Sequence, residues 1–377
     1  MYNSKIDKRL LNIIDIQSIK NRYNVVILSN DINKTKKQVT NQAHIMSSLN
    51  CISTTLSIND IIRLANLDSV QYIYSDSLVR SQIYESKKFI GIDDVYNEFG
   101  NNNTHTCVVI DTGVYPHIDF CLGKNRIIKF IDLINGREQM YDDNGHGTFV
   151  TGIICANSIT SKYSGIDNKS NIIVIKALDK NGETTTSKIL EAMQWVIDNK
   201  GLYNIKIVCM SFGSMLDSIT DPLVNGAEIL WENGIVVVAA AGNGGPMSHT
   251  IMSPGASRKI ITVGSLSSVY SGNIMVADFS SRGPVFDYYK PDMLLPGVDI
   301  ISTNVFSKNK KYYTTMSGTS VSTPMVVGIA NLLFSTNVNY TPDQIKYMLI
   351  SSCVRITGNR DSEGYGWLDL RKLIILK

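Results

Sequence analysis

Residues 107–113 read Cys-Val-Val-Ile-Asp-Thr-Gly, and this stretch decides how the rest of the chain is interpreted. Its first four residues are apolar on both faces, which is typical of a strand in a parallel sheet that helices cover on both sides. Asp111 follows this strand, and catalytic groups collect at the carboxyl ends of parallel strands. The stretch therefore predicts a buried strand that ends in a candidate catalytic carboxylate.

The same apolar pattern recurs at 172–178, 205–210, 235–240 and 260–263. Between two of these runs, residues 187–199 place their apolar side chains on one stripe of a helix. Alternating strands and helices predict an α/β fold, a doubly wound parallel sheet with helices on both faces.

The N-terminal part of the chain has a different pattern, and it predicts a separate small α+β domain of ferredoxin-like type. Asn59 is the expected N-cap of its second helix. The expected elements are strands at 23–28, 51–56 and 70–74 and helices at 31–48 and 59–67. We therefore divide the chain into residues 1–82 and 83–377.

Composition excludes several other classes of protein. Of the 377 residues, 44% are hydrophobic and 18% are charged, which suits a globular protein with an ordinary core. A net charge of +3 gives no reason to expect nucleic acid or a membrane surface as a partner. No apolar run reaches about 18 residues, and no signal-peptide pattern is visible. The six cysteines form no C-x-x-C pair and are expected to be free thiols, so the sequence predicts a cytoplasmic protein.

Four residues have surroundings that suit the hydrolysis of a peptide through a serine. This chemistry needs a nucleophile, a base, a group that orients the base, and donors for an oxyanion. Besides Asp111, His146 lies between glycines before a helical run, Asn243 follows a buried strand, and Ser317 precedes an apolar helix. Each has an ordinary alternative by itself, such as a turn residue, a structural histidine, or a helix N-cap at Ser317 or Thr319. Their joint occurrence in one α/β chain favours catalysis.

Asp-Thr-Gly also marks aspartic proteases. Those enzymes need two such aspartates, and this chain has a single Asp-Thr-Gly, so that class would require a dimer. It would also leave His146, Asn243 and Ser317 without a role.

In chain order, Asp-Thr-Gly at 111, Gly-His-Gly-Thr at 145, Ala-Ala-Gly-Asn at 240 and Ser-Gly-Thr-Ser at 317 resemble the motifs of the subtilisin-like serine proteases. The resemblance covers roughly residues 88–370. Within the family, residues 135–136, 141–146 and 203–205 are similar to the AprX-type intracellular subtilases.

The resemblance implies a role for each candidate residue. Ser317 is the nucleophile, His146 the general base, Asp111 the group that orients His146, and Asn243 an oxyanion donor beside the Ser317 backbone N–H. Two segments are implied to pair with the backbone of an extended substrate. The implied substrate-binding residues are Ser211, Phe212 and Gly213 on one side, Gly182, Glu183 and Thr184 on the other, and Ala241, Gly242 and Met252 beside them. We expect Met252 to narrow the pocket for the residue before the cut, and Glu183 to favour basic residues upstream of it.

The resemblance also implies that the N-terminal unit is an inhibitory propeptide. Its tail would lie in the active-site cleft and be cut around Gln82 and Ile83, so the expected partners are polypeptide substrates and the chain's own propeptide. Where the family commonly has His, Met, Ala and His, this chain has Phe149, Val321, Ser322 and Met325, which we expect to be packing positions.

No cofactor is required for this chemistry. Family members often carry a calcium loop after the histidine helix, but here residues 157–164 contain Lys162 and no carboxylate, so we expect no tight site there. A weaker calcium site that involves Asp119 stays an open alternative.

Two narrower functions also stay open. One is a maturation protease with a single target, such as a leader peptide. The other is a binding or regulatory protein that keeps the protease fold without turnover.

Overall fold

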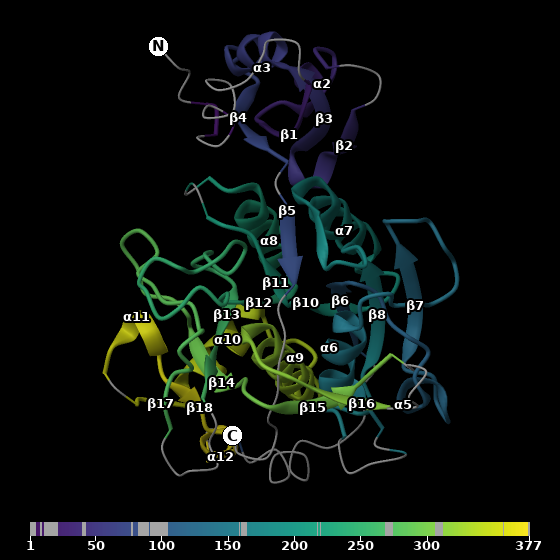
Figure 1. Ribbon diagram of the computed structural model, residues 1–377, viewed down its shortest axis with the longest axis vertical. Coiled ribbons are helices and arrows are strands. Elements are labelled where there is room, and N and C mark those ends of the chain that lie inside the picture. The colour runs from purple at the N-terminus through teal and green to yellow at the C-terminus, as the bar shows by residue number, and fades with distance from the viewer. Residues whose placement is uncertain are drawn as a thin grey trace.

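A computed structural model of the chain describes residues 5–7, 10, 22–39, 43–76, 78–81, 90, 105–157, 159, 164–216, 218, 220–267, 274–305, 312–356 and 358–375. In this part of the chain, a nine-stranded sheet forms the centre of the larger domain, and a smaller N-terminal unit lies at one end of the molecule (Figure 1).

The central sheet has the order β17-β18-β14-β13-β12-β10-β6-β8-β7. Neighbouring strands are parallel except β17 and β18, which are antiparallel. The strands are β6 (Thr106–Asp111), β7 (Ile127–Asp132), β8 (Asn171–Lys176), β10 (Ile205–Met210), β12 (Val236–Ala240), β13 (Ile261–Leu266), β14 (Met293–Pro296), β17 (Cys353–Val354) and β18 (Trp367–Leu368). The five apolar runs of the sequence are all strands of this sheet, so the predicted parallel α/β architecture is confirmed.

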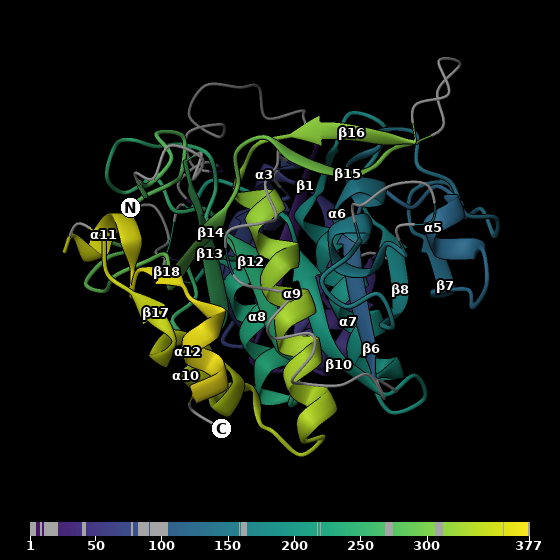
Figure 2. The same cartoon turned by 90° about the horizontal axis from the view of Figure 1, so that it is seen from below.

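Helices cover both faces of the sheet, as expected. Helices α7 and α8 pack against each other over one face, whereas α6 and α9 pack together over the other (Figures 1 and 2). The helices of this domain are α5 (Ile118–Cys121), α6 (His146–Cys155), α7 (Thr186–Asn199), α8 (Pro222–Glu232), α9 (Thr319–Thr336), α10 (Pro342–Ser351), α11 (Arg360–Glu363) and α12 (Leu370–Ile375). Among the helices that the structure describes, none combines the length and the apolar character needed to cross a bilayer.

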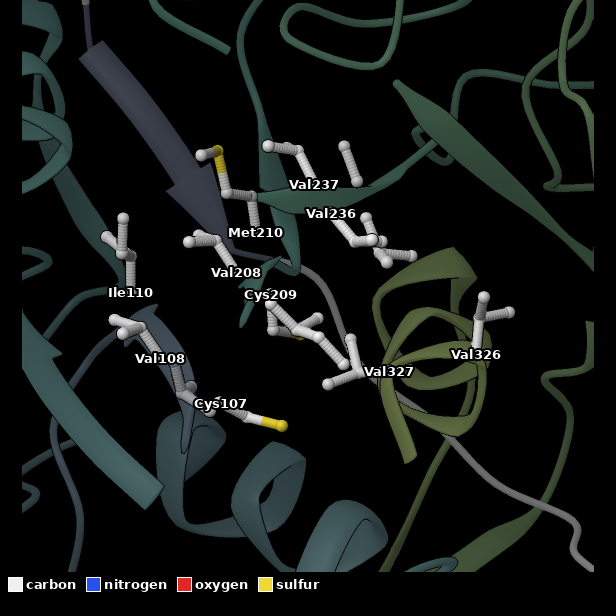
Figure 3. Packing of buried hydrophobic residues seen from close by; sticks show 14 of the residues in the cluster. Cys107, Val108, Ile110, Val208, Cys209, Met210, Val236, Val237, Val326 and Val327 are labelled. Atoms are coloured by element: carbon white, nitrogen blue, oxygen red, sulfur yellow. The ribbon is translucent and has the colours of Figure 1, made fainter. Parts of the chain in front are cut away.

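The core forms because successive strand residues point to opposite faces of the sheet. Figure 3 shows Cys209 of β10 directed toward Val327 of α9, while Val208 and Met210 point to the other side. These side chains are fully buried, so both faces of the strand contribute to one continuous core.

The N-terminal unit has the order of a ferredoxin-like fold. Its elements are β1 (Arg22–Ser29), α2 (Ile32–Lys36), β2 (His44–Met46), η1 (Ser47–Leu49), β3 (Cys51–Ser57), α3 (Ile58–Ala65) and β4 (Val70–Ser75). They form an antiparallel sheet in the order β2-β3-β1-β4. The three strands expected from the sequence are present.

Two expectations for this unit were wrong. The helix expected over 31–48 is limited to α2, and β2 occupies part of the same range because its residues pair with β3. The N-cap of α3 is Ser57 rather than Asn59, because the Ser57 side chain accepts a hydrogen bond from the backbone N–H of Asp60.

The two faces of the small sheet belong to different cores. Val25 and Ile27 of β1 pack beneath α3, whereas Val26 and Leu28 join the core of the larger domain. Polar contacts connect the units as well. The backbone N–H of Ser48 donates to Gln194 Oε1 at 2.9 Å, and Asp76 accepts a hydrogen bond from the backbone N–H of Ser187 at 2.8 Å. The N-terminal unit therefore lies directly on α7 and α8 (Figure 1).

Candidate active site

The carboxyl end of β6 and the amino end of α6 bring Asp111 and His146 into direct contact. His146 Nδ1 lies 2.7 Å from Asp111 Oδ1, and both side chains are fully buried. Because a carboxylate only accepts hydrogen bonds, Nδ1 carries the proton and Nε2 is left as the basic nitrogen. This is the pairing that the sequence predicted for a base and the group that orients it.

Glycines allow the two loops that carry these residues to approach closely. A Cβ atom on Gly113 would lie 2.3 Å from the carbonyl oxygen of Tyr141, and Gly113 has a φ of +120°. A Cβ atom on Gly147 would lie 2.2 Å from the carbonyl oxygen of Gly113. Any other residue at either position would push Asp111 and His146 apart.

Asp142 organises the loop before His146, and the sequence analysis did not identify it. Its Oδ1 accepts hydrogen bonds from Gly145 N at 2.8 Å and from Thr112 Oγ1 at 3.0 Å. Its Oδ2 accepts one from Thr148 N at 2.8 Å, inside the first turn of α6. One buried carboxylate thus joins the Asp-Thr-Gly turn to the start of the histidine helix.

Lys176, which ends β8, is a second residue that the sequence analysis missed. Its side chain is fully buried, and its Nζ donates to Thr112 O at 2.6 Å, Asp143 Oδ1 at 2.7 Å and Leu178 O at 3.0 Å. Lys176 therefore connects the residue after Asp111 with the loop that leads to His146. A polar residue at the end of an otherwise apolar strand is the signal that could have identified it.

Ser317 lies between β16 (Tyr313–Met316) and α9. The N-cap of α9 is Gly318, which makes no side-chain capping bond, so the alternative that Ser317 or Thr319 is merely an N-cap is wrong. Ser317 is half-buried, and its Oγ accepts a hydrogen bond from Asp299 N at 3.3 Å. The nucleophile candidate is thus partly open to solvent at the start of a buried helix.

A hairpin connects Ser317 to the histidine helix. It consists of β15 (Ile300–Thr303) and β16, and β16 ends next to Ser317. Ser302 Oγ donates to Phe149 O, and Thr303 Oγ1 donates to Thr148 O, both at 2.8 Å. These bonds attach the segment before Ser317 to the first turns of α6.

Asn243 contacts the first turn after Ser317. Its Oδ1 accepts hydrogen bonds from Thr319 N and Thr319 Oγ1, both at 3.0 Å. Since Oδ1 is engaged by α9, the Nδ2 group of the same amide is directed to the other side as a donor. This orientation suits an oxyanion donor.

A four-residue strand lies where the sequence predicted a bound substrate. Strand β5 (Leu78–Ser81) is hydrogen-bonded between β9 (Glu183–Thr185) and β11 (Phe212–Gly213), and it is antiparallel to both. The two expected substrate-binding segments therefore each bind an extended chain. The expected cut at Gln82 and Ile83 lies outside the described residues.

Met252 lies against Gly213 and Gly242, two of the three glycines in the expected substrate-binding set. A Cβ atom on Gly213 would be 2.7 Å from Met252 Cβ, and one on Gly242 would be 2.7 Å from Met252 Cγ. The backbone N–H of Met252 donates to Ala241 O at 2.9 Å. Ser211, which joins β10 to β11, is fully buried.

The positions that depart from the common family pattern are packing positions. Phe149, Val321 and Met325 are fully buried in the main core. Ser322 is also fully buried, and its Oγ lies 3.0 Å from Leu295 O and 2.9 Å from Ser265 Oγ.

Asp119 has the contacts of a structural carboxylate. Its Oδ1 accepts from Ile159 N at 2.8 Å and its Oδ2 from the Tyr313 hydroxyl at 2.7 Å. Most of the expected calcium loop, residues 158 and 160–163, lies outside the described residues. Among the residues that are described, no group of three His, Cys, Asp or Glu side chains converges as metal ligands would. Both Asp119 oxygens thus accept hydrogen bonds from protein donors.

The cysteines are free thiols, as expected, and four of the six are buried. Burial raises the pKa of Cys51 and Cys209 to about 12. These thiols therefore stay protonated at neutral pH, and a protonated thiol is a poor nucleophile.

Several known proteins are similar to this chain in sequence. The sequence profile of the subtilase family matches residues 103–367. Serine protease AprX of Bacillus subtilis (strain 168) is 42% identical over 273 residues, which are 65% of this chain and 60% of AprX. Subtilisin DY of Bacillus licheniformis is 31% identical over 261 residues, covering 68% of this chain and 85% of that protein. The thermophilic serine proteinase of Bacillus sp. (strain AK1) is 29% identical over 329 residues, or 85% of this chain and 75% of the relative.

The match with AprX thus spans less than two thirds of that relative's length. The profile, in contrast, covers the whole central sheet from β6 to β18. The chain belongs to the subtilase family.

Proposed function

We propose that this protein is a serine endopeptidase that hydrolyses extended polypeptides and is made as a self-inhibited precursor. The observation that carries the proposal is the buried contact of 2.7 Å between His146 and Asp111 in a chain of the subtilase family. The orientation of Asn243 and the strand held between β9 and β11 support it.

In the proposed mechanism, Ser317 Oγ attacks the carbonyl carbon of the scissile bond while His146 Nε2 takes its proton. His146 then gives this proton to the leaving amine, and a water molecule hydrolyses the acyl-enzyme by the same route. Asp111 stays ionised and stabilises the imidazolium form of His146. The Asn243 amide and the Ser317 backbone N–H donate to the oxyanion. These groups supply nucleophile, acid and base, so no cofactor takes part.

The N-terminal unit is the inhibitor in this proposal. Strand β5 follows β4 of that unit in the sequence and lies between β9 and β11, where a substrate would bind. Ser81 pairs with Phe212. For a substrate bound in this register, the next residue faces Ser211, and we place the cut after it, which is after Gln82 in this chain.

The proposed place of action is the cytoplasm, because a reducing compartment suits six free cysteines. The proposed partners are polypeptides and the chain's own N-terminal unit. A protease with one dedicated target would use the same catalytic groups, so it is a narrower form of the same proposal.

The test is the intact mass of the purified protein over time, for wild type, Ser317→Ala and Ser320→Ala. Ser320 is a suitable control because it lies in the same motif and is fully buried. We expect wild type and Ser320→Ala to split near residue 82, and Ser317→Ala to stay whole. If wild type stays whole and leaves casein intact, the protein is a binding protein with a protease fold. If Ser317→Ala also splits without added protease, Ser317 is not the nucleophile.

A further inference from the structure

The register of β5 identifies the residues that face each position of a bound chain. Arg80 lies opposite Glu183 of β9 and opposite Gly213 of β11. A residue bound at this position has an acidic neighbour on one edge and no side chain on the other. Of the β9 and β11 residues that pair with β5, only Glu183 is charged.

A tight turn holds the backbone of Glu183 in place. Asp179 N donates to Glu183 O at 2.9 Å, and Glu183 N donates to Asp179 Oδ1 at 3.0 Å. Gly182 adopts a φ of +73° within this turn. Glu183 is half-buried, so its charge is less screened than that of a fully exposed residue. The Asp179 carboxylate adds a second negative charge to the same turn.

We infer that Glu183 selects polypeptides with Arg or Lys at the third residue before the scissile bond. The inference rests on the proposed function, in which the cut follows Gln82 and Arg80 is the third residue before it. Directly opposite residues of an antiparallel pair have Cβ atoms about 4.5–5.5 Å apart, so opposite charges attract there and like charges repel. Neighbouring residues of the bound strand point to the other face and do not meet Glu183.

The test uses peptides with the sequence of residues 76–86, in which residue 80 is Arg, Lys, Gln or Glu. The mature enzyme is assayed for kcat/KM, and mass spectrometry locates the cut. We expect the Arg peptide to be cut about fivefold better than the Gln peptide and about twentyfold better than the Glu peptide. The difference is expected mainly in KM, because the ion pair forms in the bound substrate as well as in the transition state. The difference in kcat/KM between the peptides is also expected to become smaller as the salt concentration rises, because salt screens the ion pair.

Variants of the acidic residue provide the decisive comparison. Glu183→Gln is expected to cut all four peptides within about twofold of one another, and Glu183→Lys to favour the Glu peptide. The control is Glu232→Gln, which removes a surface carboxylate on α8 that pairs with Lys259, and it is expected to keep the wild-type preference.

Two outcomes would overturn the inference in distinguishable ways. If wild type cuts the Arg and Glu peptides equally well, or if Glu183→Gln keeps the preference, the inference fails and the proposed function stands. If wild type cuts none of the peptides and no casein, the proposed function fails and the inference falls with it.

Discussion

A fully buried lysine lies on each side of the central sheet along the strand direction: Lys176 where the strands end, here called the carboxyl edge, and Lys290 where they begin, here called the amino edge. The two lysines contact similar groups. At the carboxyl edge, Lys176 Nζ contacts one carboxylate and two backbone carbonyls. At the amino edge, Lys290 Nζ contacts Asp292 Oδ2 at 2.6 Å, Thr262 Oγ1 at 2.8 Å and Ile260 O at 3.1 Å. The two lysines thus make similar contacts. The two sites differ in the residues that lie on the contacted segments.

At the carboxyl edge those segments carry Asp111 and His146. At the amino edge they lead to α10, because Lys346 of that helix lies 3.0 Å from Asp292 Oδ1 and donates to Ile260 O at 2.8 Å. Burial lowers the pKa of Lys290 to about 7, an effect that the Asp292 carboxylate opposes. We conclude that one construction, a buried lysine amine among oxygen acceptors, joins the segments of the proposed catalytic residues Asp111 and His146 at one edge and attaches a C-terminal helix at the other.

The comparison is tested most directly by replacing each lysine with an uncharged residue. Lys176→Met and Lys290→Met should each cost about 1–3 kcal/mol of unfolding free energy, because buried oxygen acceptors at both sites lose their hydrogen-bond donor. Only Lys176→Met should also lower kcat, by about 10²-fold, through displacement of the loops that carry Asp111 and His146. Stability is measured by urea unfolding in a Ser317→Ala background, which prevents self-digestion. An equal loss of kcat in Lys290→Met would show that the two edges are not functionally distinct.

The next prediction, for the proposed oxyanion donor Asn243, combines a large loss of activity with a small loss of stability. Asn243→Ala should lower kcat by about 10²–10³, the range known for the corresponding Asn of subtilisin, from which the figure comes. Its urea midpoint in the Ser317→Ala background should change far less than that of Lys176→Met. A variant with full kcat would assign the oxyanion to other donors.

A smaller effect is expected for the hairpin that joins Ser317 to α6. Thr303→Val removes the bond to Thr148 O and should cost about 1 kcal/mol of stability with a few-fold loss of kcat. Thr315→Val, on an exposed side chain of the same hairpin, is the control and should change neither quantity. If both variants behave alike, the bond to α6 has no part in positioning Ser317.

The smallest effect concerns acid stability near the active-site hairpin. Burial lowers the pKa of His117 below its usual 6.5, and its Nδ1 accepts a hydrogen bond from Asp119 N. The unfolded chain therefore binds a proton more readily than the folded one. The stability from His117 should be fully present above pH 6.5 and be lost as the pH falls through 6.5 toward the lower folded pKa. His117→Asn should flatten the dependence of the urea midpoint on pH between 5 and 7.

His105 provides the control for this prediction, because burial also lowers its pKa while it lies on β6's amino side, away from the hairpin. His105→Asn should remove only the contribution of His105 to the dependence of the urea midpoint on pH, and leave the contribution of His117 unchanged. If His117→Asn leaves the slope unchanged, the neutral form of His117 does not contribute to acid stability.

The sequence predicts secondary structure well where the environment of a segment permits only a few residue types. Apolar runs identified β6, β8, β10, β12 and β13, because a strand buried on both faces tolerates few polar residues. Strand β7 was not expected, because it is the outermost strand of the sheet and two of its residues, Ile128 and Lys129, are exposed. The helix expected over 31–48 was wrong because a polar segment without an apolar stripe does not specify its structure.

The residues of the candidate site also differ in whether the local sequence indicates them. Asp111, His146 and Asn243 could be identified because each has glycines or a strand end beside it. Asp142 has no such signal, since its contact with Thr112 spans 30 residues of sequence. Lys176 has only a weak one, its place at the end of an apolar strand, and its contact with Thr112 spans 64 residues. The pairing of Arg80 with Glu183 also depends on tertiary structure and has no local signal.

Strand β5 has a hydrogen-bonding partner on each of its two edges. A polypeptide that takes its place must therefore offer a stretch of backbone whose two edges are both unoccupied. A helix satisfies its backbone groups internally, and a strand within a folded sheet already shares at least one edge with a neighbour. An unfolded chain or an extended loop that belongs to no sheet provides such a stretch. A substrate of the proposed protease would therefore be selected first by the conformation of its backbone and only then by its side chains.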